Sequence, residues 1–228
     1  MIYYTPKQVQ DYIKREMKPT KEYNGRSTIR MYLGDCMDLM KTGTWDLAIV
    51  DPPYGINASG GTGGYSRDYL NNIDKKWDNS VPSDYYFRLL KHVSANQIIW
   101  GGNYFHLPHS RGWVCWYKSD EVKGRDFSEF ELAFTSFNKP ARHYEEKPFI
   151  RNGKRIHPTQ KPVKLYKWLL TNYAKEGDTI LDTHGGSFSI AIACWDLGFD
   201  LDIIELDEDY FNDAVKRFEQ HISQTQLF

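Results

Sequence analysis

The tetrapeptide Asp51–Tyr54, with the sequence Asp-Pro-Pro-Tyr, carries the residue types of this chain that most directly suit a chemical step. That step would be the activation of an amino group on a nucleobase, which is a poor nucleophile because its lone pair is delocalised into the ring. The carboxylate of Asp51 and the backbone carbonyl of Pro52 could each accept one amino hydrogen and so free the lone pair. Together with Pro53, Pro52 fixes φ and removes backbone donors, which holds that carbonyl in place.

Tyr54 adds an aromatic ring on which a base that has left its stack could pack, a contact worth about 1–3 kcal/mol. The preceding residues Trp45–Val50 are a compact apolar run, which predicts a buried strand that ends at a sheet edge. The alternative is a rigid turn with a solvated Asp51. The position directly after a buried strand favours the chemical interpretation.

Three further acidic residues, Asp35, Asp182 and Glu205, stand at or just after predicted apolar strands. Ligands of parallel sheets bind outside the carboxyl ends of the strands, so we expect these acids and Asp51 at one edge. Glu205 stands 23 residues after Asp182. In dinucleotide-binding folds an acid about 20 residues on accepts hydrogen bonds from ribose hydroxyls, and Glu205 suits that role.

The strands and helices that would position these residues alternate along most of the chain. Apolar runs predict strands at Thr28–Leu33, Trp45–Val50, Gln97–Gly101, Trp113–Tyr117, Phe130–Ser136, Thr179–Asp182 and Leu201–Glu205. Helical spacing predicts helices at Thr5–Met17, Ser83–Ala95, Pro162–Lys175, Ser187–Leu197 and Glu208–Ile222. This alternation predicts an α/β fold with a mostly parallel sheet covered on both faces, in a single domain spanning residues 1–228.

Three motifs, in their order, resemble those of the amino-group DNA methyltransferases, which methylate adenine N6 or cytosine N4. Asp51–Tyr54 looks like their catalytic motif, and His157–Pro162 (His-Pro-Thr-Gln-Lys-Pro) matches a second element. Asp182–Ser187 (Asp-Thr-His-Gly-Gly-Ser) is similar to their cofactor loop between a strand and a helix. The catalytic motif precedes the cofactor loop, which resembles the β group of this family. The resemblance covers roughly Met31 to Phe218.

The resemblance implies a Rossmann-like class I methyltransferase fold with a mostly parallel seven-stranded sheet and helices on both faces. It implies S-adenosyl-L-methionine as the cofactor and in-line transfer of its methyl group to N6 of a flipped adenine in DNA. The implied catalytic residues are Asp51, Pro52, Pro53 and Tyr54. The implied cofactor-binding residues are Asp35, Cys36, Asp51, His157, Pro158, Thr159, Lys161, Asp182, Thr183, His184, Gly185, Gly186, Ser187, Glu205 and Leu206.

Some of these residues receive separate roles from the resemblance. Gly185 and Gly186 allow close backbone approach where a strand gives way to a helix. Asp35 resembles the family position that meets the adenine of the cofactor, and the segment His157–Lys161 would wrap its methionine end. Lys161 would pair with the methionine carboxylate, and a lysine that simply faces solvent remains the alternative.

Phe188 departs from the family pattern, which usually has a small residue at this position. Phe188, Ile192 and Trp195 are spaced to share one face of the predicted helix, so we expect Phe188 to pack inward. If its ring instead crowded the cofactor, the chain would be a DNA-binding relic without activity.

The acceptor base is adenine in the interpretation that we favour, because the family associates Asp at position 51 with adenine and Ser more often with cytosine. Cytosine N4 in DNA and adenine in RNA remain alternatives.

Two segments are candidates for contacting DNA. Gly55–Gly64 has five glycines in ten residues and predicts a loop, either a lid beside the catalytic motif or a plain flexible loop. Phe137–Ile156 has no clear periodicity. The range from Phe137 to Lys161 contains seven basic and two acidic residues, which gives a local charge of +5. This short insertion would grip phosphates in place of a target-recognition domain, or form a solvated basic loop. The candidate DNA contacts are Tyr65, Arg67, Lys139, Arg142, Arg151, Lys154 and Arg155.

The bulk composition argues against several other classes of protein. The formal net charge of −1 is not that of a polycation that coats nucleic acid indiscriminately. Three cysteines far apart in sequence favour a reducing cytoplasm, and no apolar run approaches the roughly 18 residues of a membrane span. The seven histidines show no metal-ligand spacing. We therefore expect a cytoplasmic protein without membrane or metal partners that acts on DNA. A second copy of the chain or a separate specificity partner remains open.

Overall fold

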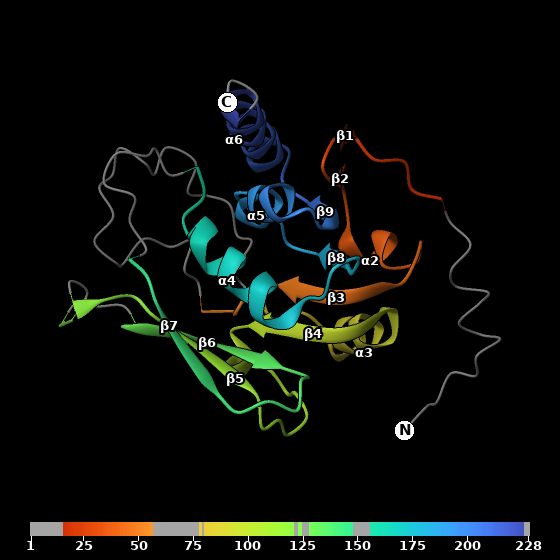
Figure 1. Cartoon of the computed structure of the whole chain (residues 1–228). Helices are drawn as coiled ribbons and strands as arrows, with labels where there is room; N and C mark the ends of the chain where they lie inside the picture. Colours follow the sequence, from red (N-terminus) through yellow and green to blue (C-terminus); the bar gives the residue numbers. More distant parts are fainter. Residues whose placement is uncertain are drawn as a thin grey trace.

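Figure 1 shows the sheet around which the chain folds, in a computed structural model that describes residues 16–56, 78, 80–120, 123–124, 128–147 and 156–225. Within these ranges nine strands form one sheet in the order β1-β2-β9-β8-β3-β4-β6-β5-β7. The strands are β1 (Lys21–Asn24), β2 (Thr28–Leu33), β3 (Trp45–Val50), β4 (Ser94–Trp100), β5 (Trp113–Tyr117), β6 (Phe130–Thr135), β7 (Arg142–Glu145), β8 (Thr179–Asp182) and β9 (Asp200–Glu205). The helices are α2 (Cys36–Leu39), α3 (Asp84–Val93), α4 (Val163–Tyr173), α5 (Ser189–Leu197) and α6 (Glu208–Thr225), with one 3-10 turn, η3 (Gly102–Tyr104).

Five neighbouring strands, β2, β9, β8, β3 and β4, run parallel. Strand β6 is antiparallel to both β4 and β5. These pairings confirm the expected α/β fold with a mostly parallel sheet. The seven predicted strands make up its interior, and β1 and β7 extend the two edges, so the described sheet has nine strands rather than seven.

The two edge strands have no apolar pattern that could have revealed them. β1 and β7 are four residues long, and most of their residues are exposed. Their backbones pair with β2 and β5, and such pairing is independent of side-chain periodicity. The segment Phe137–Ile156 therefore contains a strand at Arg142–Glu145 that its sequence does not indicate.

Alternate residues of the central strands pack on opposite faces of the sheet. In β3, Leu47 and Ile49 lie in the core cluster that includes side chains of α4, α5 and α6. Ala48 and Val50 lie in the second cluster, which includes side chains of α2 and α3. Helices thus cover both faces (Figure 1), which is why the strands read as continuous apolar runs in the sequence.

Some of the element boundaries that differ from the prediction have local reasons. Helix α3 passes directly into β4 at Ser94, whose extended backbone ends the helix, so the helix is shorter than Ser83–Ala95 and the strand begins earlier than Gln97. Helix α5 begins at Ser189 because Phe188 adopts a left-handed conformation, with φ of 54°. The predicted N-terminal helix Thr5–Met17 lies outside the described residues except for Glu16 and Met17, which are not in a helix.

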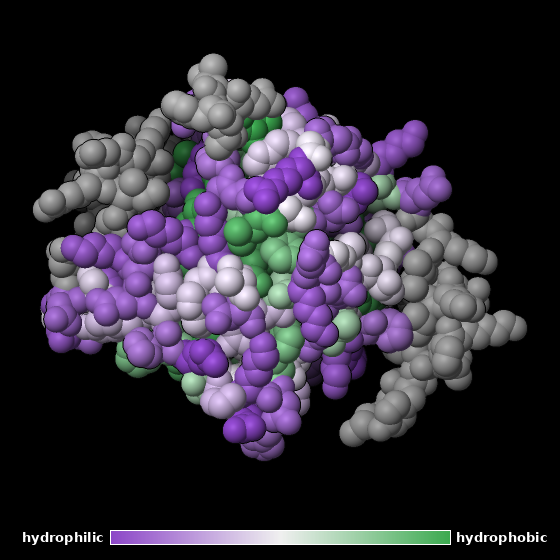
Figure 2. Space-filling model, viewed as in Figure 1, coloured by the Kyte–Doolittle hydropathy of each residue, from purple (hydrophilic) through white to green (hydrophobic). Residues whose placement is uncertain are grey.

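The face of the molecule seen in Figure 2 is largely hydrophilic, with a small hydrophobic area near its middle. Among the helices that the structure describes, none combines the length and hydropathy that crossing a membrane requires.

Candidate active site

The strand order brings the four predicted acids to one edge of the sheet. Strands β2, β9, β8 and β3 are neighbours, and they end at or just before Asp35, Glu205, Asp182 and Asp51, respectively. The backbone N–H of Gly34 donates to the carbonyl of Glu205 at 2.9 Å, which ties the ends of β2 and β9 together. The expectation of a common edge, made from the parallel-sheet rule, is confirmed by this topology.

Asp51 lies directly after β3 and forms two side-chain contacts. Its Oδ1 accepts a hydrogen bond from the hydroxyl of Tyr54 at 2.6 Å. Its Oδ2 lies 2.5 Å from the Nζ of Lys161. The side chain of Lys161 is 1% exposed, so the alternative in which this lysine faces solvent is wrong.

Glu131 extends this contact into a chain of alternating charges. Its Oε2 lies 3.1 Å from the Nζ of Lys161, and its Oε1 lies 2.6 Å from the Nζ of Lys118. Glu131 belongs to β6, and Lys118 directly follows β5. Sequence reasoning missed both residues. The available signal was a glutamate next to the apolar residues of Phe130–Thr135, where an acid needs a partner.

The protonation states follow from burial and from this alternation of charges. Burial raises the pKa of Asp51, and the nearby ammonium of Lys161 opposes that rise. Burial would lower the pKa of Lys161, but the carboxylates of Asp51 and Glu131 outweigh it and raise that pKa. Burial also opposes ionisation of Glu131, yet Lys161 and Lys118 bring its pKa down to about 2. Glu131 and Lys161 are therefore charged at neutral pH.

Tyr54 is held by contacts on its backbone and on its ring. Its backbone N–H donates to Oδ1 of Asp78 at 2.7 Å. Its ring stacks on that of Tyr104, with centroids 5.1 Å apart and an interplanar angle of 15°. A Cβ at Gly101 would overlap the Tyr54 ring, and Gly101 has φ of +68°, so glycine is required there for both reasons. Tyr104, which sequence reasoning did not select, is 41% exposed.

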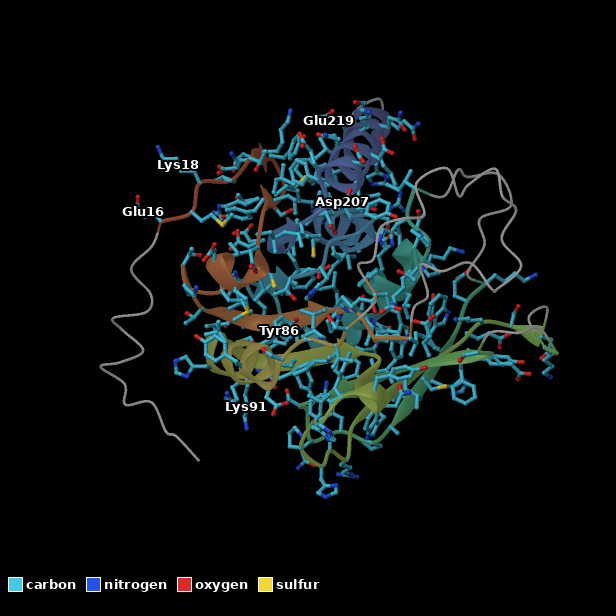
Figure 3. The ribbon with its side chains drawn as sticks, turned by 180° about the vertical axis from the view of Figure 1, so that it is seen from behind. Glu16, Lys18, Tyr86, Lys91, Asp207 and Glu219 are labelled. Carbon is cyan, nitrogen blue, oxygen red and sulfur yellow. The ribbon has the colours of Figure 1, made fainter. Side chains whose placement is uncertain are left out.

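The loop that follows β8 is anchored from both sides. The hydroxyls of Tyr86 and Thr183 are 2.6 Å apart, and the N–H of His184 donates to Asp182 at 3.0 Å. On the other side the N–H of Gly186 donates to Oε2 of Glu205 at 2.7 Å. Figure 3 marks Tyr86, on α3, and Asp207, directly before α6; the loop contacts Tyr86 on one side and Glu205, at the end of β9, on the other.

Glu205 combines a fixed orientation with unused acceptor capacity. Its Oε1 accepts the N–H of Asp207 at 2.9 Å, and its Oε2 accepts the N–H of Gly186. A carboxylate offers about four acceptor positions, so two remain for a ligand. The next residue, Leu206, is 74% exposed and offers an apolar surface beside that carboxylate. Burial raises the pKa of Glu205, which the backbone N–H groups partly offset.

Asp182 and His184 are both uncharged over part of the neutral pH range. Burial raises the pKa of Asp182 to about 8, and the carboxylates of Asp51 and Glu205 add to this rise. Burial lowers the pKa of His184 to about 4. The loop therefore presents a neutral imidazole.

Phe188 packs inward, as the spacing of the apolar residues predicts. Its side chain is fully buried, and its ring meets the ring of Phe211 edge-on with centroids 5.7 Å apart. A Cβ at Gly185 would overlap the Phe188 ring, so the glycine at position 185 is required by the phenylalanine beneath it. The left-handed backbone of Phe188 costs about 1–2 kcal/mol, which its burial offsets.

The His157–Lys161 segment lies against the same loop. The ring of His157 would lie 3.5 Å from a Cβ at Gly186, and it packs on the ring of Tyr210 with centroids 4.5 Å apart. Pro158 and Thr159 are exposed. Lys161, at the end of the segment, points to Asp51. The segment thus connects the glycine loop with the Asp51–Tyr54 tetrapeptide.

Two of the DNA-contact candidates lie in the described residues. Lys139 donates to the carbonyl of Asn172 at 2.8 Å and lies over the rings of Phe137 and Tyr173, so it fastens the chain to α4. Arg142 is exposed on β7. The remaining candidates lie outside the described residues: Tyr65, Arg67, Arg151, Lys154 and Arg155. No cluster of His, Cys, Asp or Glu suited to a metal ion occurs in the part of the chain that the structure describes.

The chain is similar to DNA methyltransferases of known sequence or structure. A profile of the family described as DNA methylase, which covers N6 and N4 methyltransferases, matches residues 94–216. The type II methyltransferase M2.DpnII of Streptococcus pneumoniae is 25% identical over 256 residues, covering 88% of this chain and 93% of that protein. The crystal structure of the M1.HpyAVI–SAM complex has a TM-score of 0.54 and 21% identity, covering 83% of this chain and 99% of that one. The cytosine-N4-specific PvuII DNA methyltransferase has a TM-score of 0.55 and 13% identity, covering 86% and 90%.

Proposed function

The chain belongs to the DNA methylase family of N6 and N4 amino-methyltransferases, and we propose that it methylates N6 of adenine in DNA. As a member of that family it is a DNA methyltransferase that acts on an exocyclic amino group and uses S-adenosylmethionine. The choice of adenine is the proposed part. It is supported by Asp51, since aspartate at this position of the motif is associated with adenine.

The observation that carries the proposal is the placement of Asp51. Its carboxylate lies at the carboxyl end of β3, between the hydroxyl of Tyr54 and the ammonium of Lys161. The glycine loop follows β8, which is the neighbour of β3, and Glu205 ends β9, the next strand in the sheet order. Methyl transfer between bound reactants requires a group that accepts the hydrogen of the target amine and a cofactor site close to it, and residues suited to both lie at this edge.

The residues at this edge fit S-adenosylmethionine. Glu205 retains acceptor positions for two ribose hydroxyls, and the exposed Leu206 suits the flat face of an adenine. Gly185 and Gly186 would let the backbone of the loop lie close to the cofactor. When bound, the cofactor supplies an electrophilic methyl group on a sulfonium. Because Phe188 lies in the core, the sequence argument for a relic unable to bind the cofactor loses its basis.

The chain's own residues would prepare the acceptor. Asp51 and the carbonyl of Pro52 would each accept one hydrogen of the target amine, and the carboxylate faces the positive charge that develops on the nitrogen as the carbon–nitrogen bond forms. Tyr54 would hold the flipped base, and Tyr104, which stacks on Tyr54, would extend the aromatic surface. Buried and fixed groups at this point need little reorganisation during the reaction.

The test is transfer of a radiolabelled methyl group to DNA and to RNA, followed by identification of the labelled nucleoside. We expect label in N6-methyldeoxyadenosine, with none for Asp51→Ala. Asp38→Ala is a matched control, because its side chain is 51% exposed and belongs to α2. Label in N4-methyldeoxycytidine would replace adenine by cytosine as the substrate. Label found in RNA alone would mean that RNA, and not DNA, is the substrate.

A further inference from the structure

The ion pairs behind Asp51 form a connected chain that the activation of an amine does not by itself require. Lys161 contacts Asp51, Glu131 contacts Lys161, and Lys118 contacts Glu131, at 2.5, 3.1 and 2.6 Å. We propose that Lys161, held in place by Glu131, is a positioning residue that fixes the carboxylate of Asp51 and supplies the positive charge facing it. This inference rests on the proposed function, since it assigns Asp51 the role of amine acceptor.

The alternative role for Lys161 is to bind the carboxylate of the cofactor, as the family resemblance implies. An ammonium group has three donors. Three oxygens surround the Nζ of Lys161, from Asp51 at 2.5 Å, from Glu131 at 3.1 Å and from Tyr54 at 3.4 Å. The same nitrogen lies 5.2 Å from the centroid of the Trp100 ring and 5.9 Å from that of Tyr54. A further carboxylate could reach it only by displacing one of these partners.

The surroundings of Asp51 show why a cation is needed there. The groups that interact electrostatically with Asp51 come from several elements: Tyr54, Glu131 on β6, Asp182 on β8, Tyr86 on α3, Tyr166 on α4, and Lys161. All but Lys161 are carboxyl groups or phenols. Among the described residues, Lys161 is also the one cation within ion-pair distance of Asp51.

Removing the charge of Lys161 should raise the pKa of Asp51. Burial and the charge of Glu131 raise the pKa of Asp51, and Lys161 opposes them. Without Lys161 the pKa of Asp51 rises further, and the carboxylate that accepts the amine hydrogen is present only at higher pH. An opposite charge at this distance typically moves a carboxyl pKa by about one to three pH units.

Removing the charge of Glu131 should lower the pKa of Asp51. Glu131→Gln keeps the shape of the side chain and deletes a negative charge that raises the pKa of Asp51. The acid limb of the rate profile should then move to lower pH. The plateau rate should also fall, because Lys161 loses one of its partners. A merely structural role would not move the acid limb in opposite directions in the variants of these two neighbouring residues.

The experiment measures single-turnover methyl transfer to DNA from about pH 6 to about pH 9 for the wild type and three variants. Single turnover is required because product release limits many enzymes and would mask a change in the chemical step. Lys161→Met deletes the charge, and Glu131→Gln deletes its partner. Lys164→Met is the matched control, since this lysine lies three residues further on and its side chain is 77% exposed. Cofactor affinity of each variant is measured by calorimetry.

The acid limb of Lys161→Met should move up by about one to three pH units, and its rate at neutral pH should fall by about tenfold or more. The limb of Glu131→Gln moves down, and cofactor affinity stays within a few-fold in both. Should Lys161→Met fail to fold, the downward shift of Glu131→Gln carries the test.

Two results would overturn the inference while the wild type still transfers methyl groups. One is a rate of Lys161→Met that is lowered equally at every pH. The other is a large loss of cofactor affinity in that variant with an acid limb that does not move. Absence of transfer by the wild type at every pH would instead contradict the proposed function itself.

Discussion

Replacing Glu205 by alanine should weaken the binding of S-adenosylmethionine by an amount that can be worked from the contacts of its carboxylate. Two of its four acceptor positions are taken by the N–H groups of Gly186 and Asp207, at 2.7 and 2.9 Å. The other two are proposed to accept ribose hydroxyls. Hydrogen bonds to an ionised group contribute about 1.5–3 kcal/mol each, and water in the space left by the side chain recovers part of that. The net loss should be about 1–3 kcal/mol, or about 5- to 150-fold in Kd.

Isothermal titration calorimetry of the cofactor against purified wild type and Glu205→Ala measures this loss directly. Glu208→Ala is the matched control, because Glu208 is exposed in the first turn of α6, three residues further along. Circular dichroism establishes that each variant is folded. The affinity of the wild type should also fall as the pH drops through the raised pKa of Glu205, a dependence that the alanine variant should lack. An unchanged Kd in folded Glu205→Ala would remove this residue from the cofactor site.

Three further predictions address chemistry, stability and DNA binding. Asp51→Ala should abolish methyl transfer and leave cofactor affinity within a few-fold, as single-turnover assays and calorimetry would show. Burial raises the pKa of Asp182 to about 8, so the folded state binds a proton that the unfolded state has lost above about pH 4. Stability of the cofactor-free protein should therefore fall as the pH rises to about 8, and Asp182→Asn should reduce this fall in urea unfolding. Replacing Arg151, Lys154 and Arg155 together should flatten the slope of log DNA affinity against log salt by about two to three units.

Each of these has an outcome that contradicts it. More than about a tenth of wild-type turnover in Asp51→Ala, with each tenfold worth about 1.4 kcal/mol, would remove its role in amine activation. The same pH dependence of stability in Asp182→Asn and in the wild type would mean that Asp182 does not titrate as described. An unaltered salt slope in the triple variant would mean that DNA is held elsewhere, and Gly55–Arg67 would be the next segment to replace.

Most of the strands and helices could be predicted from the sequence, because the residue patterns that indicate them are local. Four strands, at Thr28–Leu33, Trp45–Val50, Trp113–Tyr117 and Thr179–Asp182, have the bounds predicted from apolar runs. The expectation that Phe188 packs inward is likewise confirmed, although Phe188 precedes α5 in a left-handed conformation instead of belonging to the helix. The edge strands β1 and β7 were missed, because backbone pairing at a sheet edge needs no apolar residues.

The location of the candidate site at one sheet edge could also be predicted from the sequence. The motifs Asp51–Tyr54 and Asp182–Ser187 follow predicted parallel strands, and the carboxyl ends of such strands meet at one edge whatever the loops do. This rule placed Asp35, Asp51, Asp182 and Glu205 together before any contact was known, and the strand order confirms it.

Which charged side chains form ion pairs could not be predicted from the sequence, because it depends on how distant segments pack. Nothing in the local sequence of Lys161 distinguishes a lysine that faces solvent from one that is 1% exposed and bound to Asp51, 110 residues earlier. Glu131 is brought to Lys161 by the antiparallel pairing of β6 with β4 and β5. Strand periodicity sets the face on which a side chain lies, but the partner of a buried charge depends on how distant segments pack, and that is fixed only when the whole sheet has formed.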